Sequence, residues 1–339
     1  FLVRRERFVR ITNDYIFPVF MFPLQIDAFL TAFANRILLS GLLALLFLTA
    51  CGTDEIPPPD VDHLKKELTL LRFEQDLFAI DTTDVANAIA ALEAKYTDFT
   101  DVYFRYAIPL KRGDFGPAEQ VDVLKAFLRY PLIQETYSAT QAKFSELQSS
   151  KEKVEKAIAY YTYYFPEAET PDTLVTFMSQ FEYAGFLYGN NQLAVGLDMY
   201  LGPDFDYKAI SPSEPIFSDY LTRTYTPDHL PVKLSQLLVE EQVTEPDQGR
   251  LIDYMVYNGK KLYLLDLLLP KTPDHLKLEI TTDQTNWLAD NETAVYIYLQ
   301  SQELLFETDT RKYRKYIDPS PNSPGMPDGA PGRSANYVG

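Results

Sequence analysis

Cysteine, histidine and tryptophan are scarce in this sequence: one cysteine, three histidines and one tryptophan occur among 339 residues. A single cysteine excludes an intrachain disulfide and a zinc site built from several thiolates. A zinc peptidase needs His-Glu-x-x-His on a helix, and residues 230–233 after His229 supply neither the glutamate nor the second histidine. We therefore expect His63, His229 and His275 to be surface or helix-capping residues rather than metal ligands.

Motifs for other chemistries are missing as well. The sequence has no Gly-x-Ser-x-Gly motif for a serine nucleophile and no glycine-rich loop for a phosphate group. Neighbouring acids such as Glu240 with Glu241, or Asp204 with Asp206, could serve glycoside hydrolysis. Such pairs are expected by chance among 48 acidic residues. The residues therefore identify no catalytic group, no metal site and no cofactor.

Negative charge dominates, with a formal net charge of −17. After residue 50 the chain contains 26 basic and 45 acidic residues, so this part alone has a charge of −19. Such a surface repels nucleic-acid phosphates and anionic lipid headgroups. Nucleic acid is therefore excluded as a partner, and membrane attachment has to come from an anchor.

A secretory signal precedes the only cysteine. Arg36 is followed by an apolar run over 37–48, too short for a membrane span, and then by Thr49, Ala50 and Cys51. Leu48, Thr49, Ala50 and Cys51 resemble a lipobox, which predicts cleavage before Cys51 and lipid attachment to its thiol. Residues 1–50 are the expected signal region, and we expect the true start of the protein to lie after the first residues of the stretch 1–35. Residues 51–63 form a lipidated, proline-containing tether.

Residues 64–318 are expected to form one α+β domain, mostly helical with a small central sheet. Lys151, Lys153 and Lys156 with intervening glutamates predict a solvated helical face. Apolar periodicity, caps and β-rich runs predict helices over 84–96, 118–128, 140–165, 228–241, 251–269 and 286–305, and strands over 68–73, 173–178 and 193–198.

Several of these segments resemble the gliding motility lipoprotein GldB family. The resemblance is carried by 253–270, by 287–292 with 303–309, by 173–178, by 193–202 and by 331–339. Residues that match the family signature in the helix over 251–269 are Asn258, Gly259, Lys260, Tyr263, Asp266 and Pro270.

The resemblance changes the interpretation of the last residues. The composition of 320–339 alone is typical of a disordered tail. The family instead implies that 319–339 form a structured loop leading to a C-terminal helix that this chain lacks. It also implies a degenerate zincin-like architecture, in which Asn258-Gly259 replaces the Glu-Gly pair that supplies a metal ligand in related peptidases.

The resemblance therefore implies a non-enzymatic, lipid-anchored protein required for gliding motility and the associated secretion machinery. Its expected partners are envelope proteins of that machinery, and its expected place is the cell envelope, with the outer membrane or cell surface favoured over the inner membrane. Two alternatives stay open. One is a glycan-binding lipoprotein, suggested by 24 tyrosines and 22 phenylalanines, and the other is a divergent hydrolase that uses carboxylates.

Overall fold

A computed structural model of the chain describes residues 57–108, 110, 116–247 and 249–339. The predicted signal region, Leu48, Thr49, Ala50 and Cys51 lie outside the described residues. Residues 58–339 form one compact unit. Within the described part of the chain, no helix is long and apolar enough to cross a membrane.

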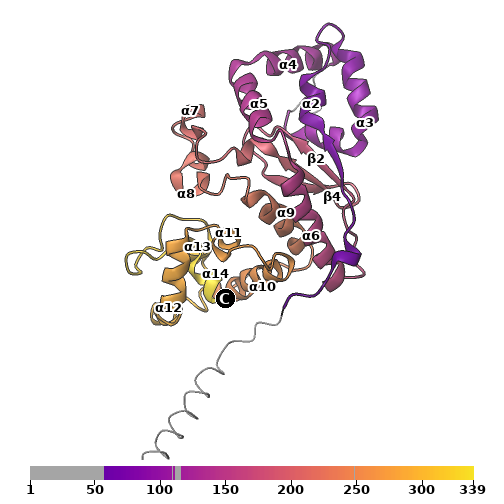
Figure 1. Ribbon diagram of the computed structural model, residues 1–339. Coiled ribbons are helices and arrows are strands. Elements are labelled where there is room, and N and C mark those ends of the chain that lie inside the picture. The colour runs from indigo at the N-terminus through magenta and orange to yellow at the C-terminus, as the bar shows by residue number, and fades with distance from the viewer. Residues whose placement is uncertain (1–56, 109, 111–115, 248) are drawn as a thin grey trace, which may run out of the picture. The chain divides into compact units, whose positions relative to one another are not determined.

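A four-stranded mixed sheet lies at the centre of this unit (Figure 1). Its strands are β1 (Thr69–Arg72), β2 (Thr173–Phe177), β3 (Gly185–Tyr188) and β4 (Gln192–Gly196), in the order β1-β2-β4-β3. β2 is parallel to both β1 and β4, whereas β3 and β4 form an antiparallel hairpin. The predicted strands over 68–73, 173–178 and 193–198 are present, and the sequence prediction missed only the short edge strand β3.

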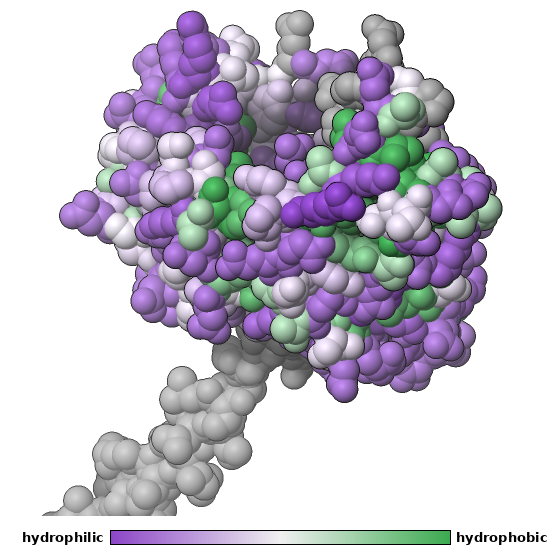
Figure 2. Space-filling view, turned by 90° about the horizontal axis from the view of Figure 1, so that it is seen from above, coloured by the Kyte–Doolittle hydropathy of each residue, from purple (hydrophilic) through white to green (hydrophobic). Residues whose placement is uncertain are grey.

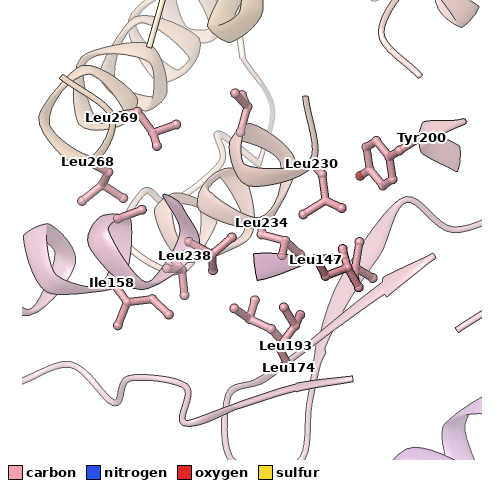
Figure 3. Packing of buried hydrophobic residues seen from close by; sticks show 14 of the residues in the cluster. Leu147, Ile158, Leu174, Leu193, Tyr200, Leu230, Leu234, Leu238, Leu268 and Leu269 are labelled. Carbon is pink, nitrogen blue, oxygen red and sulfur yellow. The ribbon is translucent and has the colours of Figure 1, made fainter. Parts of the chain in front are cut away.

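Helices cover both faces of the sheet because successive side chains of a strand point in opposite directions. Leu174, Leu193 and Val195 belong to a core formed with α6 (Gln148–Tyr164) and α9 (His229–Glu240). In Figure 3, Leu230, Leu234 and Leu238 of α9 point toward Leu174 and Leu193. The opposite face packs on a second core, formed with α2 (Phe73–Phe78), α3 (Val85–Tyr106) and α4 (Pro117–Arg129).

The regular elements of the C-terminal part are all helices, and this part has a core of its own, in which Met255, Leu299, Tyr313 and Ala335 are buried. It consists of α10 (Leu251–Leu268), α11 (Asp274–Leu278), α12 (Thr282–Ser301), α13 (Thr310–Ile317) and α14 (Ser334–Val338). The remaining short elements are η1 (Asp62–Leu64), η2 (Leu197–Tyr200), α7 (Tyr207–Ile210), η3 (Pro215–Phe217) and α8 (Asp219–Thr222). The prediction of a mostly helical α+β fold with a small sheet is confirmed.

The single helix predicted over 140–165 is wrong. The structure has two helices, α5 (Pro131–Lys143) and α6, separated by four residues. Phe144 and Leu147 in this break are buried in the first core, and the Phe144 carbonyl accepts a hydrogen bond from Arg72 Nη1 at 3.1 Å. The break has no proline or glycine, so the local sequence did not signal it.

The predicted solvated lysine face is also partly wrong. Lys153 is exposed, but Lys151 on the same helix is buried, with 6% of its side chain accessible. Lys151 Nζ lies 2.7 Å from the carboxylate of Glu155, which is buried as well and also accepts the Leu68 backbone N–H. A buried lysine is tolerated here because its charge is paired with a hydrogen-bonded carboxylate.

Two further predicted helices differ at their ends. The helix expected over 84–96 continues to Tyr106, after a non-helical residue at Thr97. The helix expected from 286 begins at Thr282, because Thr281 and Gln284 form a reciprocal capping box.

Most aromatic side chains serve packing. Phe73 is fully buried and makes edge contacts with the rings of Tyr96, Phe99 and Tyr103, at 4.7 to 4.9 Å between centroids. Figure 2 shows a mainly hydrophilic face on which hydrophobic residues gather in separate groups. The high aromatic content is therefore explained mainly by the core.

Candidate functional site

Helix α9 presents two different stripes of side chains. Leu230, Leu234 and Leu238 recur every four residues and face the sheet. A second, polar stripe recurs at helical spacings of three or four residues. It is formed by His229, Lys233, Gln236 and Glu240. Lys233 lines two cavities that lie between α9 and the C-terminal segments of the chain.

The two cavities adjoin each other. The first, the central cavity, has a volume of about 200 Å³ and is lined by segments around η2 and α8, by α9 and by the C-terminal segments. The second, the adjoining cavity, has about 250 Å³ and lies along α9, α10 and α11. Lys233, Glu279, Pro319 and Arg333 line both cavities, so these residues form the boundary between them.

Glu279 is the buried anion at this boundary. It follows α11, and Lys233 Nζ and Arg333 Nη1 both contact its carboxylate. Burial raises the pKa of Glu279, but the two cations outweigh that effect and hold the pKa well below its usual range. Glu279 is therefore ionised in the folded protein.

Both Glu279 and Arg333 have left-handed backbone conformations, with φ angles of 58° and 61°. Non-glycine residues adopt this conformation at a cost of about 1 kcal/mol or more, and such residues concentrate at functional sites. Glu279 ends α11 and Arg333 precedes α14. The tertiary structure therefore maintains this ion pair against local backbone preference.

Arg223 is a half-buried cation in the central cavity. Its Nη1 donates to Gln284 Oε1 at 3.2 Å, and its buried Nε has no hydrogen-bond partner among the residues that the structure describes. Burial lowers the pKa of Arg223, and the nearby Arg333 lowers it further. An arginine remains protonated under these conditions.

His229 and Lys233 have the i, i+4 spacing that two zinc-ligating histidines have in His-Glu-x-x-His. Leu230 occupies the place of the glutamate, and an ammonium group has no lone pair for a metal ion. The surface or capping position expected for His229 is wrong: its side chain is buried, with Nδ1 2.8 Å from Thr226 Oγ1. Burial lowers the pKa of His229 to about 4, so the imidazole is neutral at pH 7.

Within the described ranges, no group of three or more histidine, cysteine, aspartate and glutamate side chains is placed to hold a metal ion. His63 is exposed, and His275 lies in the short helix α11.

The signature residues of α10 separate into two groups. Asn258 lines the adjoining cavity and donates a hydrogen bond from Nδ2 to Asn336 Oδ1 at 2.9 Å. Gly259 lies against the backbone of Gly339, which a Cβ atom at position 259 would overlap. Asn258 and Gly259 therefore form the surface of α10 on which the segment around α14 packs.

The other signature residues lie farther along α10. Asp266 forms an ion pair with the buried Lys277 of α11. Lys260 and Pro270 are exposed, and Tyr263 is 63% exposed. Helix packing therefore does not explain Tyr263.

In each acidic pair considered for hydrolysis, one member has a structural partner. Glu240 forms an ion pair with Lys261 of α10 at 2.6 Å. Asp206 caps α7 by accepting the backbone N–H of Ala209 at 3.1 Å.

Exposed aromatic side chains occur in several segments of the chain. Those with the largest accessible fractions are Tyr106, Tyr130, Tyr163, Tyr263, Tyr296 and Phe306.

Sequence reasoning missed Arg223, Glu279 and Arg333, and it noted Lys233 only as a departure from the histidine motif. Glu279 and Arg333 lie far from Arg223 and Lys233 in the chain, so no local spacing relates the four residues. A sequence signal existed only for Arg333, which lies within the segment 331–339 that carries the family resemblance.

Residues 54–339 match the model of a protein family described as gliding motility protein GldB. No curated protein and no solved structure matches the chain. The family match covers all of the globular unit, including the cavities and the signature residues of α10.

Proposed function

This chain belongs to the GldB family of gliding motility lipoproteins, and we propose from that premise that it is a non-enzymatic protein of the gliding machinery. It acts by binding other envelope proteins, and it supports the protein secretion coupled to gliding. The observation that carries the proposal is the family match over residues 54–339.

The proposed anchor is lipid on Cys51, with the outer membrane or cell surface as its place. Each buried methylene of an acyl chain contributes about 0.8 kcal/mol, so two or three chains hold a protein at a membrane stably. Confinement near the membrane raises the effective concentration of the domain toward membrane partners. An acidic domain benefits from such an anchor because anionic headgroups repel it.

We expect Cys51→Ala to release the protein from the membrane fraction and to abolish colony spreading. The test complements a deletion strain with the wild-type gene, with Cys51→Ala or with Thr53→Ala, which changes the tether but keeps the thiol. Spreading and secretion should return with the wild-type and Thr53→Ala genes only. Normal spreading and secretion in the deletion strain would refute the proposed function.

The proposal includes a degenerate, zincin-like origin of the helical framework. Its support is the donor set: Lys233 and Asn258 occur where a metalloenzyme would use an imidazole and a carboxylate, and neither is a good zinc ligand. A framework of this kind retains a groove that can bind protein without cleaving it. Fold-level analogy alone does not fix function, so the metal content has to be measured.

We expect the purified protein to contain much less than one zinc ion per chain after equilibration with zinc and removal of free metal. Elemental analysis measures this content, and a His-Glu-x-x-His enzyme handled in parallel is the control. One tightly bound zinc per chain would contradict a non-enzymatic role and would favour the hydrolase alternative.

A further inference from the structure

The central cavity has more positive charge than its lining neutralises. Its charged lining residues are Arg223, Lys233, Arg333 and Glu279. Among the described lining residues, three cations against one carboxylate give this cavity an excess of two positive charges. This excess lies inside a protein whose net charge is −17, so general surface composition does not explain it.

Arg223 is the cation with unused binding capacity. Lys233 and Arg333 both contact Glu279, whereas the Arg223 guanidinium donates to the neutral amide of Gln284. Its Nε is buried and has no hydrogen-bond partner within the described part of the chain. A buried donor without an acceptor is unfavourable, and the planar guanidinium fork matches a carboxylate in a bidentate arrangement.

The walls beside these charges are apolar and aromatic. Met199, Tyr200, Leu221, Tyr225 and Ile280 contribute to the lining. The volume of about 200 Å³ is smaller than pockets for drug-sized ligands, which begin at about 300 Å³. It suits one side chain or one chain terminus that combines an acidic group with an apolar stem.

We propose that the central cavity binds a carboxylate on an apolar or aromatic stem, presented by a peptide segment of a partner protein. The adjoining cavity gives the reason to favour a peptide: it shares Lys233, Glu279 and Arg333 with the central cavity and is lined by the amides of Gln236 and Asn258, which can hydrogen-bond to an extended backbone. The inference rests on the proposed function, because it names the chemistry through which a partner is held.

Titration calorimetry on the full chain in detergent tests the proposal with matched ligand pairs. The peptide pair is N-acetyl-Ala-Phe with a free carboxylate and the same dipeptide as its C-terminal amide. The small-molecule pair is phenylacetate and phenylacetamide. We expect one dipeptide carboxylate to bind per chain, at least tenfold more tightly than its amide and at least tenfold more tightly than phenylacetate.

Arg223→Gln should weaken dipeptide binding at least tenfold. Arg105→Gln is the matched control, because Arg105 lies on the surface of α3, where it pairs with Asp101 at 3.1 Å. If Arg223→Gln lowers the melting temperature strongly, Arg223→Lys is used in its place. This variant keeps the positive charge but loses the guanidinium fork, so we expect it to fold and to bind the dipeptide severalfold more weakly than the wild type.

Several outcomes would overturn the inference. They are equal affinity for carboxylate and amide, unchanged affinity in the folded Arg223 variants, and binding of inorganic phosphate without binding of carboxylates. Phenylacetate that binds as tightly as the dipeptide would overturn the assignment to a peptide in favour of a free organic acid. If the carboxylates do not bind but the deletion strain fails to spread, only this inference is refuted. If the deletion strain spreads normally, the proposed function is refuted, whatever the cavity binds.

Discussion

Glu279→Gln is expected to lower the free energy of unfolding by about 3 kcal/mol. The substitution keeps the size of the side chain but removes the carboxylate that Lys233 and Arg333 both contact. Breaking a buried ion pair from one side is costly because the partner charges stay in a poorly solvated place. Urea denaturation of both proteins at pH 7 measures the difference.

Glu303→Gln is the matched control, since Glu303 also has a left-handed backbone, with φ of 56°, but is exposed. It should change stability by less than about 0.5 kcal/mol. The double variant Lys233→Met with Glu279→Gln should recover part of the loss, because it also removes one of the unpaired charges. A Glu279→Gln variant as stable as the control would show that the ion pairs contribute nothing to folding.

The loss should also depend on pH. The pKa of Glu279 is depressed in the folded state, so the stabilisation is fully present above the ordinary value of 4.5. It disappears as the pH falls through the lower pKa of the folded protein. The difference between wild type and Glu279→Gln should therefore be constant from pH 6 to 8 and shrink progressively below about pH 4.

Asp198→Ala is expected to destabilise the protein by about 4 kcal/mol. The Asp198 carboxylate is fully buried and accepts the backbone N–H and the hydroxyl of Ser179 and the backbone N–H of Phe181, at 2.8 to 3.0 Å. Gln180 and Phe181 have positive φ angles of 59° and 64°, so these hydrogen bonds stabilise a strained turn. Alanine leaves three buried donors without an acceptor.

This loss matters for the site because Asp198 lies in η2, which also contains Met199 and Tyr200 of the central cavity. Asp204→Ala is the control, an exposed aspartate close by in the sequence. Urea denaturation gives the stability, and calorimetry with the dipeptide carboxylate reports whether the cavity survives. A loss below about 1 kcal/mol would mean that water satisfies the donors in the variant.

Much of the fold could be predicted because local patterns encode it. β-branched and apolar runs bounded by proline, glycine and asparagine located β2 and β4, and apolar periodicity located α4, α9 and α10. The prediction failed where long-range contacts decided the local structure. Phe144 leaves a helical path because its side chain enters the core, and Lys151 is buried because Glu155 and the chain around Leu68 pack over it.

The sequence by itself predicted a lipoprotein signal and determined the acidic character and the family. Each of these depends on residue identity and local order: one cysteine after an apolar run, the balance of charges, and the signature over 253–270. Only the tertiary structure decided which charges face one another. Arg223, Lys233, Glu279 and Arg333 come from four separate segments, and their partners become defined when α9, α11 and α14 pack. Electrostatic interactions depend on distance and burial, which sequence separation does not specify.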